Sequence, residues 1–146
     1  KAKRFENYLD AIKRIQATGI SVNGTFVLGL DSHTADIFAE TRDFVRASNL
    51  LEVQLTVQTP FPGTPLYERL KQSGRLLTDR YWDRCTLFDM NYKPINMSVD
   101  ELEAGLRWLA GEIYNDQEFT RRKRHYMDLT RERMRNFRRE GLLKCG

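Results

Sequence analysis

Two short stretches of the chain, residues 20–29 and 53–59, alternate between apolar and polar side chains. Strands that are covered on one face only show this pattern. The apolar face of the two predicted strands consists of Val22, Phe26, Leu28, Val53, Leu55 and Val57. The opposite face consists of Asn23, Thr25, Val27, Gln54, Thr56 and Gln58.

Helical spacing of apolar residues fills the intervals around these strands. It predicts helices over 5–18, 37–48 and 65–73, a further one that opens at Ser98, and a long one between 117 and 140. Gly19 stands at a C′ position, and Thr64-Pro65 reads as an N-cap followed by proline at the first helical position. Ser98 and Glu101 form a capping box. These signals predict where the first helix ends and where the third and fourth helices begin.

The order helix–strand–helix–strand–helix contains a βαβ unit, whose strands are expected to be parallel. We therefore predict an α/β fold: the last βα units of a partial TIM-type barrel, followed by a C-terminal α-helical hairpin. The expected domains are 1–77 for the barrel part, 78–97 for a linking segment and 98–146 for the helical part. In such a barrel the polar strand face looks inward and favours a ligand-holding interior; the alternative is a sheet face open to solvent.

Positive charge is concentrated near the C-terminus. The net charge of the 146 residues is +4, but residues 117–146 carry ten basic and four acidic side chains, which leaves the rest of the chain acidic. Clustered arginine suits an RNA-binding module. We rank that function third, after an enzyme fragment and a helical docking domain, because Asp128, Glu132 and Glu140 interrupt the basic run. The stripe Phe119, Tyr126, Met134 and Phe137 is expected to be hairpin core.

Other features exclude several classes of protein. No apolar run approaches the ~20 residues that span a bilayer. We expect a cytoplasmic protein and, since the chain opens at Lys1 without an initiator methionine or a signal peptide, a piece of a longer parent protein. Cys85 and Cys145 belong to no ligand cluster, so we expect reduced thiols and no metal site.

Two phrases carry a resemblance to a known family. Phe26-Val27-Leu28-Gly29-Leu30, with Thr34, Phe38 and Glu40-Thr41 after it, resembles the fifth strand–loop–helix of radical S-adenosylmethionine (SAM) enzymes. The run from Gln58 to Pro65 resembles the turn after the sixth strand of that family. Asp31-Ser32-His33-Thr34 is similar to the sequence at this position in the branch of the family that has an N-terminal cobalamin-binding domain. The stretches Asn91–Pro94, Met97-Ser98, Leu109 and Ile113-Tyr114 resemble the uncharacterised helical C-terminal domain of that branch.

The resemblance implies cofactors for the parent protein rather than for this chain. The family holds a four-iron four-sulfur cluster with a CxxxCxxC motif, which this chain lacks. The parent is therefore expected to bind SAM and the cluster, with cobalamin left open, and this chain alone to bind none of them. The expected cofactor-binding residues are Asn23, Thr25, Val27, Gly29, Gln58, Pro60 and Gly63. Gln54 and Thr56 are expected to line the substrate cavity, and no residue is assigned a catalytic role.

Each of these assignments has a simpler alternative. Gly29 and Gly63 can merely permit turns, and we weigh that reading equally with ligand contact. His33 and His125 are expected to be solvated rather than catalytic. For Asp31 we favour capping of the next helix over contact with a ribose hydroxyl.

The expected partners are the upstream barrel strands and a cobalamin-binding domain of the same protein. A two-stranded sheet leaves both outer edges open. We therefore expect the chain by itself to associate as a homodimer.

Overall fold

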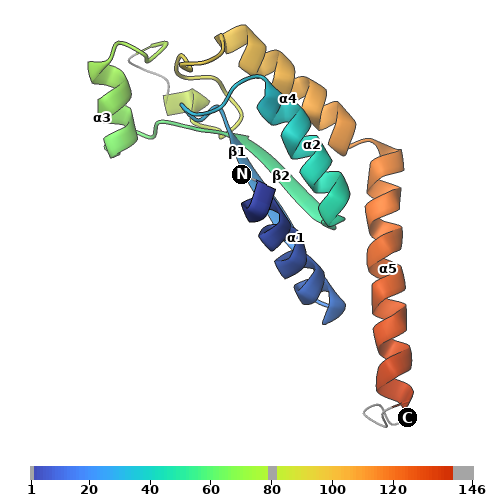
Figure 1. Ribbon diagram of the computed structural model, residues 1–146. Helices are drawn as coiled ribbons and strands as arrows, with labels where there is room; N and C mark the ends of the chain where they lie inside the picture. The colour runs from blue at the N-terminus through green and yellow to red at the C-terminus, as the bar shows by residue number, and fades with distance from the viewer. Residues whose placement is uncertain (1, 79–81, 140–146) are drawn as a thin grey trace. The chain divides into compact units, whose positions relative to one another are not determined.

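The computed structural model describes residues 2–78 and 82–139, which form helices and one small sheet (Figure 1). The elements are α1 (Ala2–Ala17), β1 (Asn23–Leu28), α2 (Asp36–Ser48), β2 (Glu52–Val57), α3 (Pro65–Gln72), the 3-10 turn η1 (Trp82–Arg84), α4 (Val99–Ile113) and α5 (Asp116–Arg139). The α/β class predicted from the sequence is confirmed.

The sheet consists of β1 and β2, and the two strands are parallel, as the βαβ order predicts. The Gln58 amide donates to the Leu28 carbonyl at 2.9 Å, which aligns the C-terminal ends of the strands. In this register the residues before 22 lie beside the connection that precedes β2. The predicted strand therefore starts late, at Asn23, and Ile20 remains 60% exposed.

The alternation of the strands matches their burial. In β1 the side chains of Asn23, Thr25 and Val27 are exposed and Leu28 is buried. The outer edge of β2 is partly covered, since the Val57 amide donates to the Leu87 carbonyl at 2.7 Å. The expectation that both edges are open is therefore wrong for this part of β2.

The chain divides into two compact units, each made of several segments. The first consists of residues 1–24, 42–53 and 112–146, and the second of 25–41 and 54–111. In the first unit α1 packs on α5, and Phe5 meets Phe44 edge to face with ring centroids 5.0 Å apart. The Gln16 amide donates to the carbonyls of Ser48 and Asn49, which end α2.

In the second unit, α4 packs on the end of β1 and on the start of α2. Its capping box forms as predicted: the Ser98 hydroxyl accepts from the Glu101 amide, and the Glu101 carboxylate accepts from the Ser98 amide. Leu102 is fully buried against Gly29. Gly105 lies directly under the Phe38 ring, so this helix approaches α2 closely.

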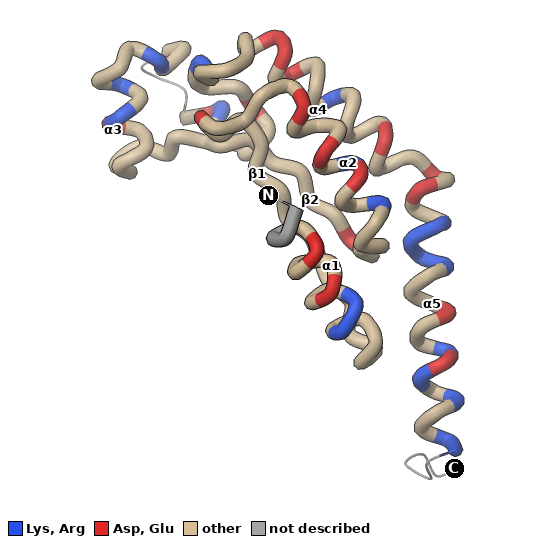
Figure 2. The backbone as a smooth tube through the Cα atoms, in the orientation of Figure 1, with Lys and Arg blue, Asp and Glu red and all other residues tan. Residues whose placement is uncertain are grey.

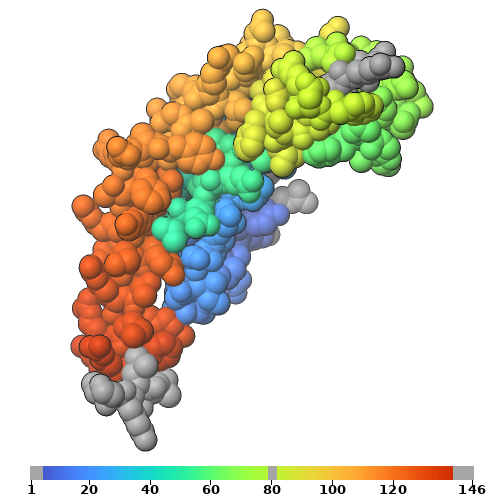
Figure 3. All heavy atoms as spheres, turned by 180° about the vertical axis from the view of Figure 1, so that it is seen from behind, coloured from blue at the N-terminus to red at the C-terminus, as the bar shows by residue number. Residues whose placement is uncertain are grey.

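The segment after α3 folds back along the same unit, where Tyr67 and Trp82 have ring centroids 6.4 Å apart. In Figure 3 the residues from α3 to about position 92, coloured green to yellow, lie against one another. Met90 and Tyr92 are buried, whereas Trp82 and Phe88 are more than half exposed. Met97 is buried as well, so the linking segment contributes three apolar residues to the core.

The long helix α5 buries only part of the predicted stripe, since Tyr126 and Phe137 are half-buried. Phe119 and Met134 are 50% and 42% exposed, so the assignment of both to a hairpin core is wrong. The face of α5 that is buried within the first unit carries Tyr126, which donates to the Gly19 carbonyl at 3.5 Å, and Arg122, which is 2% exposed. Arg122 donates to the Ile113 carbonyl at 2.9 Å at the end of α4, and its burial lowers the pKa of the guanidinium.

A hairpin of α4 and α5 stays a prediction, because the contacts described for α5 join it to α1, to the C-terminal end of α2 and to the C-terminal end of α4. Between these helices Asn115 acts as the predicted break. Its side-chain oxygen accepts from the Glu118 amide at 2.9 Å, which caps α5. Because the cap involves only residues of the first turn, it defines the residue at which α5 begins.

Candidate functional site

The candidate site lies at the carboxyl ends of β1 and β2, where parallel sheets bind ligands. On the polar face Thr25, Val27 and Gln54 are exposed. Thr56 is buried and its hydroxyl donates to the Phe26 carbonyl at 3.3 Å, so it holds the two strands together. Asn23 is exposed and belongs to the other compact unit, so the structure does not group it with these residues.

Gln58 is the last residue of this polar face, and its side-chain amide is unusual. Its backbone N–H pairs with Leu28, but its side-chain oxygen Oε1 is buried, and no atom in residues 2–78 or 82–139 donates a hydrogen bond to it. A buried acceptor without a donor costs about 1–3 kcal/mol. This oxygen is therefore suited to a donor that comes from a ligand or from another segment of a longer protein.

A tight turn follows β1. Gly29 is buried with φ +83°, a conformation that favours glycine. The Leu30 amide donates to Nδ1 of His33 at 3.3 Å, and the His33 amide donates to the Leu30 carbonyl at 2.8 Å. His33 thus closes the turn, and the expectation of a solvated side chain is wrong.

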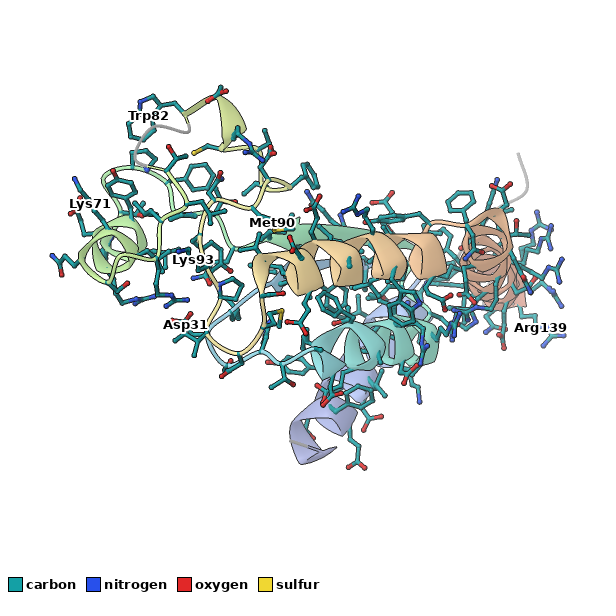
Figure 4. The ribbon with its side chains drawn as sticks, turned by 90° about the horizontal axis from the view of Figure 1, so that it is seen from above. Asp31, Lys71, Trp82, Met90, Lys93 and Arg139 are labelled. Carbon is teal, nitrogen blue, oxygen red and sulfur yellow. The ribbon has the colours of Figure 1, made fainter. Side chains whose placement is uncertain are left out.

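Asp31 pairs with a distant arginine instead of capping α2. Arg75 donates to both carboxylate oxygens of Asp31, at 2.6 and 3.2 Å. These hydrogen bonds lower the pKa of Asp31 below its ordinary value, against the opposing effect of burial. The capping role favoured from the sequence is therefore wrong. Figure 4 shows Asp31 and Lys93 at the same end of the second unit, and the Lys93 carbonyl accepts from Arg75 Nε at 2.8 Å.

Tyr92 is the most deeply buried aromatic side chain at this turn, with 1% of its surface exposed. Its hydroxyl donates to the Gly29 carbonyl. Burial, together with the charge of Asp31, raises the pKa of Tyr92 to about 12, so the hydroxyl stays protonated and remains a donor. The guanidinium of Arg75 lies 5.9 Å from the ring centroid of Tyr92.

The proline-rich turn after β2 is also closed by its own residues. The Thr64 hydroxyl donates to the Phe61 carbonyl at 2.6 Å and accepts from the Tyr67 amide at 3.3 Å, as the predicted N-cap requires. Pro60 is buried, while Gly63 has φ +77° and no heavy atom within 4 Å of the place where a Cβ would stand. In this chain Gly63 therefore serves the turn geometry. Contacts of either residue with a cofactor stay predictions.

Metal-binding geometry is not seen in this region. Within residues 2–78 and 82–139, no three His, Cys, Asp or Glu side chains are grouped so that they could hold an ion. Cys85 is a free, half-buried thiol whose pKa is raised by burial, and Cys145 lies outside the described residues. The described part of the chain also contains no helix with the length and apolar character needed to cross a membrane.

The sequence did not identify Arg75, Tyr92 and Asn96 as site residues, although all three bond the turn after β1. The only signal was indirect: Tyr92 stands in the Asn91–Pro94 stretch that resembles the C-terminal domain of the cobalamin-binding branch. Their partners lie 44 to 65 residues away, beyond the reach of any periodicity.

Comparison with known proteins gives related sequences for most of the chain. A bacteriochlorophyllide d C-12(1)-methyltransferase of Chlorobaculum tepidum is 25% identical over 121 residues, which cover 83% of this chain and 26% of that protein. An uncharacterized methyltransferase of Pyrococcus horikoshii is 28% identical over 68% of this chain and 21% of its own length. A hopanoid C-2 methylase of Rhodopseudomonas palustris is 31% identical over 49% of this chain and 14% of its own length. The chain thus spans about a quarter or less of these relatives.

A family model described as "Domain of unknown function (DUF4070)" matches residues 64–144, more than half of the chain. This segment contains Arg75, Tyr92 and Asn96, and it includes α3, α4 and α5. The resemblance to the C-terminal part of radical SAM enzymes of the cobalamin-binding branch is confirmed. The chain therefore belongs to the DUF4070 family.

Proposed function

We propose that this chain supplies the adenine side of a SAM-binding site in a longer methyltransferase. In this proposal β1 and β2 are the last strands of a partial TIM-type barrel, and upstream strands add to the edge of β1. The outer edge of β2 is partly covered by Leu87, which favours β1 as the strand beside which further strands are added. The related proteins are about four or more times longer than the matched region, which leaves room for such strands.

The orphan oxygen of Gln58 is the observation that carries the proposal. It lies on the polar face at the carboxyl end of β2, and the same face of the sheet carries the exposed side chain of Val27. A flat heteroaromatic ring with an exocyclic amine, such as adenine, matches an apolar contact next to one hydrogen-bond acceptor. Pro60 and the backbone of Gly29 border the same end of the sheet and complete the proposed contact set.

The chemistry of the cofactor belongs to the parent protein. SAM supplies a transferable methyl group, which agrees with the word methyltransferase or methylase in the names of the related proteins. We extend that class of reaction to the parent, but not the substrates in those names. The proposed ligands of the iron–sulfur cluster, and any cobalamin site, lie in parts of the parent outside this chain, and Gln54 and Thr56 face the substrate cavity.

The test uses the full-length parent, reconstituted with iron and sulfide without oxygen, and measures SAM binding by equilibrium dialysis. Gln58→Met removes the orphan acceptor at similar volume, and Gln117→Met changes an exposed glutamine of α5, outside the proposed site, as the matched control. Loss of a hydrogen bond to a buried acceptor predicts about tenfold weaker binding for Gln58→Met. Equal affinity of both variants and the wild type would contradict the proposed role.

The stability of the chain by itself gives a second readout. Because Gln58→Met removes a buried acceptor that has no donor here, it should not lower the free energy of unfolding of the 146-residue chain, and we expect it to raise it by about 0.5–1 kcal/mol. A loss of stability would show that a group of this chain already satisfies Gln58.

A second candidate function rests on the exposed face of α5. Figure 2 shows Lys and Arg along much of this helix. At helical spacing one side of α5 carries Met127, Met134 and five exposed cations, Lys123, Arg124, Arg131, Arg135 and Arg138; at its border Asp128 pairs with Arg131 at 3.4 Å. This face suits an acidic docking partner or an RNA backbone.

Filter binding of a labelled single-stranded RNA at low and moderate salt separates these two options. An RNA-binding module should bind at low salt and lose affinity steeply as salt rises, because each neutralised phosphate releases counterions. Absence of binding at low salt would leave the docking helix, with the rest of the parent protein as its proposed partner.

The exposed edge of β1 also carries the proposal of a homodimer. Without its upstream strands, the chain should associate through this edge. Sedimentation velocity at micromolar concentration tests this, and a monomer with slowly exchanging β1 amides would contradict it.

A further inference from the structure

We infer that three residues of the DUF4070 segment, Arg75, Tyr92 and Asn96, form a clamp that fixes the turn after β1, and that they are positioning residues for SAM. The second half of this inference rests on the proposed function. The first half concerns this chain alone and gives part of the domain of unknown function a defined task.

The clamp binds the turn at Gly29 and at Asp31. The Tyr92 hydroxyl donates to the Gly29 carbonyl, and Asn96 Nδ2 donates to the Asp31 carbonyl at 2.8 Å. Arg75 holds the Asp31 carboxylate through two hydrogen bonds. Main chain and side chain of the turn are therefore both held by residues that come from one later segment, 75–96.

The clamp is itself a braced structure. Residues 75–77 pair with residues 91–93: the Lys93 amide donates to the Arg75 carbonyl at 2.8 Å, and the Leu77 amide donates to the Asn91 carbonyl at 3.0 Å. An antiparallel bridge joins Leu76 and Tyr92 between them. Arg75 and Tyr92 therefore stand on one short antiparallel ladder, so their donors keep a fixed separation.

The buried position of Tyr92 makes the grip tight. With 1% exposure the ring has no room to turn away, and Leu102 of α4 packs beside it against Gly29. A turn held in this way does not have to be ordered when a ligand arrives, so binding avoids that entropy cost. Since Val27 and the Gly29 backbone are proposed SAM contacts, the clamp would act on SAM affinity through them.

Amide hydrogen exchange tests the clamp without any ligand. Tyr92→Phe removes one hydroxyl, and Tyr114→Phe is the matched control, since its hydroxyl donates to the Val53 carbonyl of β2 at 3.1 Å. We expect amides of the 29–33 turn to exchange about 2–10 times faster in Tyr92→Phe, as the loss of one hydrogen bond implies. The Tyr114→Phe variant should leave that turn unchanged. Equal exchange of the turn in both variants would overturn the clamp.

SAM affinity of the full-length parent, reconstituted as above, tests the positioning role at a temperature where all variants are folded. Tyr92→Phe should weaken binding several-fold, about as much as one hydrogen bond is worth, whereas Tyr114→Phe should not. Asn96→Ala serves as a second variant, because its side chain is exposed and its loss should leave the fold intact. A merely structural role would lower the folded fraction but not the affinity of folded protein.

The outcomes separate the two proposals. If the wild type binds SAM and both Tyr92→Phe and Asn96→Ala bind it equally well, the positioning role is wrong and the proposed function stands. If the wild type fails to bind SAM, the proposed function and the positioning role fail together, while the exchange experiment still decides the clamp.

Discussion

Replacing Gly29 by alanine should destabilise the chain far more than the same change at Gly63. Both glycines have positive φ, +83° and +77°, so each substitution carries the conformational cost of about 1–2 kcal/mol for an L-residue. The environments differ. A Cβ at Gly29 would overlap the Tyr92 hydroxyl and stand 2.9 Å from Leu102 Cδ2, whereas a Cβ at Gly63 meets nothing within 4 Å.

The packing part can be worked from this contrast. Tyr92 and Leu102 are 1% and 0% exposed and have no free space to move into. Overpacking of this kind costs about 1–3 kcal/mol, which brings the total for Gly29→Ala to about 2–5 kcal/mol. Gly63→Ala should stay at about 1–2 kcal/mol, because it carries only the conformational cost.

Urea unfolding followed by circular dichroism measures both values from the midpoints and slopes. The double variant Gly29→Ala/Tyr92→Phe isolates the contact with the hydroxyl, and its cost should be smaller than the sum of the two single changes by at least about 0.5 kcal/mol. Equal losses for Gly29→Ala and Gly63→Ala, with additive behaviour of the double variant, would refute the close approach of Tyr92 to the turn.

Three further outcomes are expected. Within α4, Gly105→Ala should destabilise the chain by about 1–3 kcal/mol, because a Cβ there would overlap the buried Phe38 ring. Gly111→Ala should stabilise it by about 0.5–1 kcal/mol through helix propensity, since a Cβ there meets nothing within 4 Å. A melting temperature that shifts in the same direction for both variants would contradict this. Arg75 lowers the pKa of Asp31 below 3.8, so Asp31→Asn should lower the free energy of unfolding near neutral pH by about 0.5–1 kcal/mol, a value discounted for the 38% exposure of the carboxylate. This loss should fade as pH falls below about 4, because the carboxylate is then protonated. An equal loss at pH 7 and pH 3 would exclude the ion pair as its cause. Treatment of the chain with iron and sulfide without oxygen should give no charge-transfer absorbance, and stoichiometric iron that depends on either cysteine would show that this chain alone holds a cluster.

Local signals in the sequence determined the elements and several of their ends. The capping box at Ser98, the proline after Thr64 and the C′ glycine at position 19 act within one helical turn, so no distant contact is needed to read them. The alternation of the two strands and the single helix between them were likewise sufficient for the parallel pairing. The orphan acceptor of Gln58 stands at a position that the resemblance had already marked.

Only the tertiary structure decided which partners these elements take. The apolar residues of α5 cover a broad stripe, and periodicity cannot say which edge of it is buried. In the structure Tyr126 and the charged Arg122 lie on the buried side, whereas Phe119 and Met134 remain exposed. Asp31 has a local option, a helix cap, and a distant one, Arg75, and folding brings the distant one within 2.6 Å. A capping pattern spans three residues, whereas the pairing of Asp31 with Arg75 spans 44 and depends on closing the chain through β2 and α3.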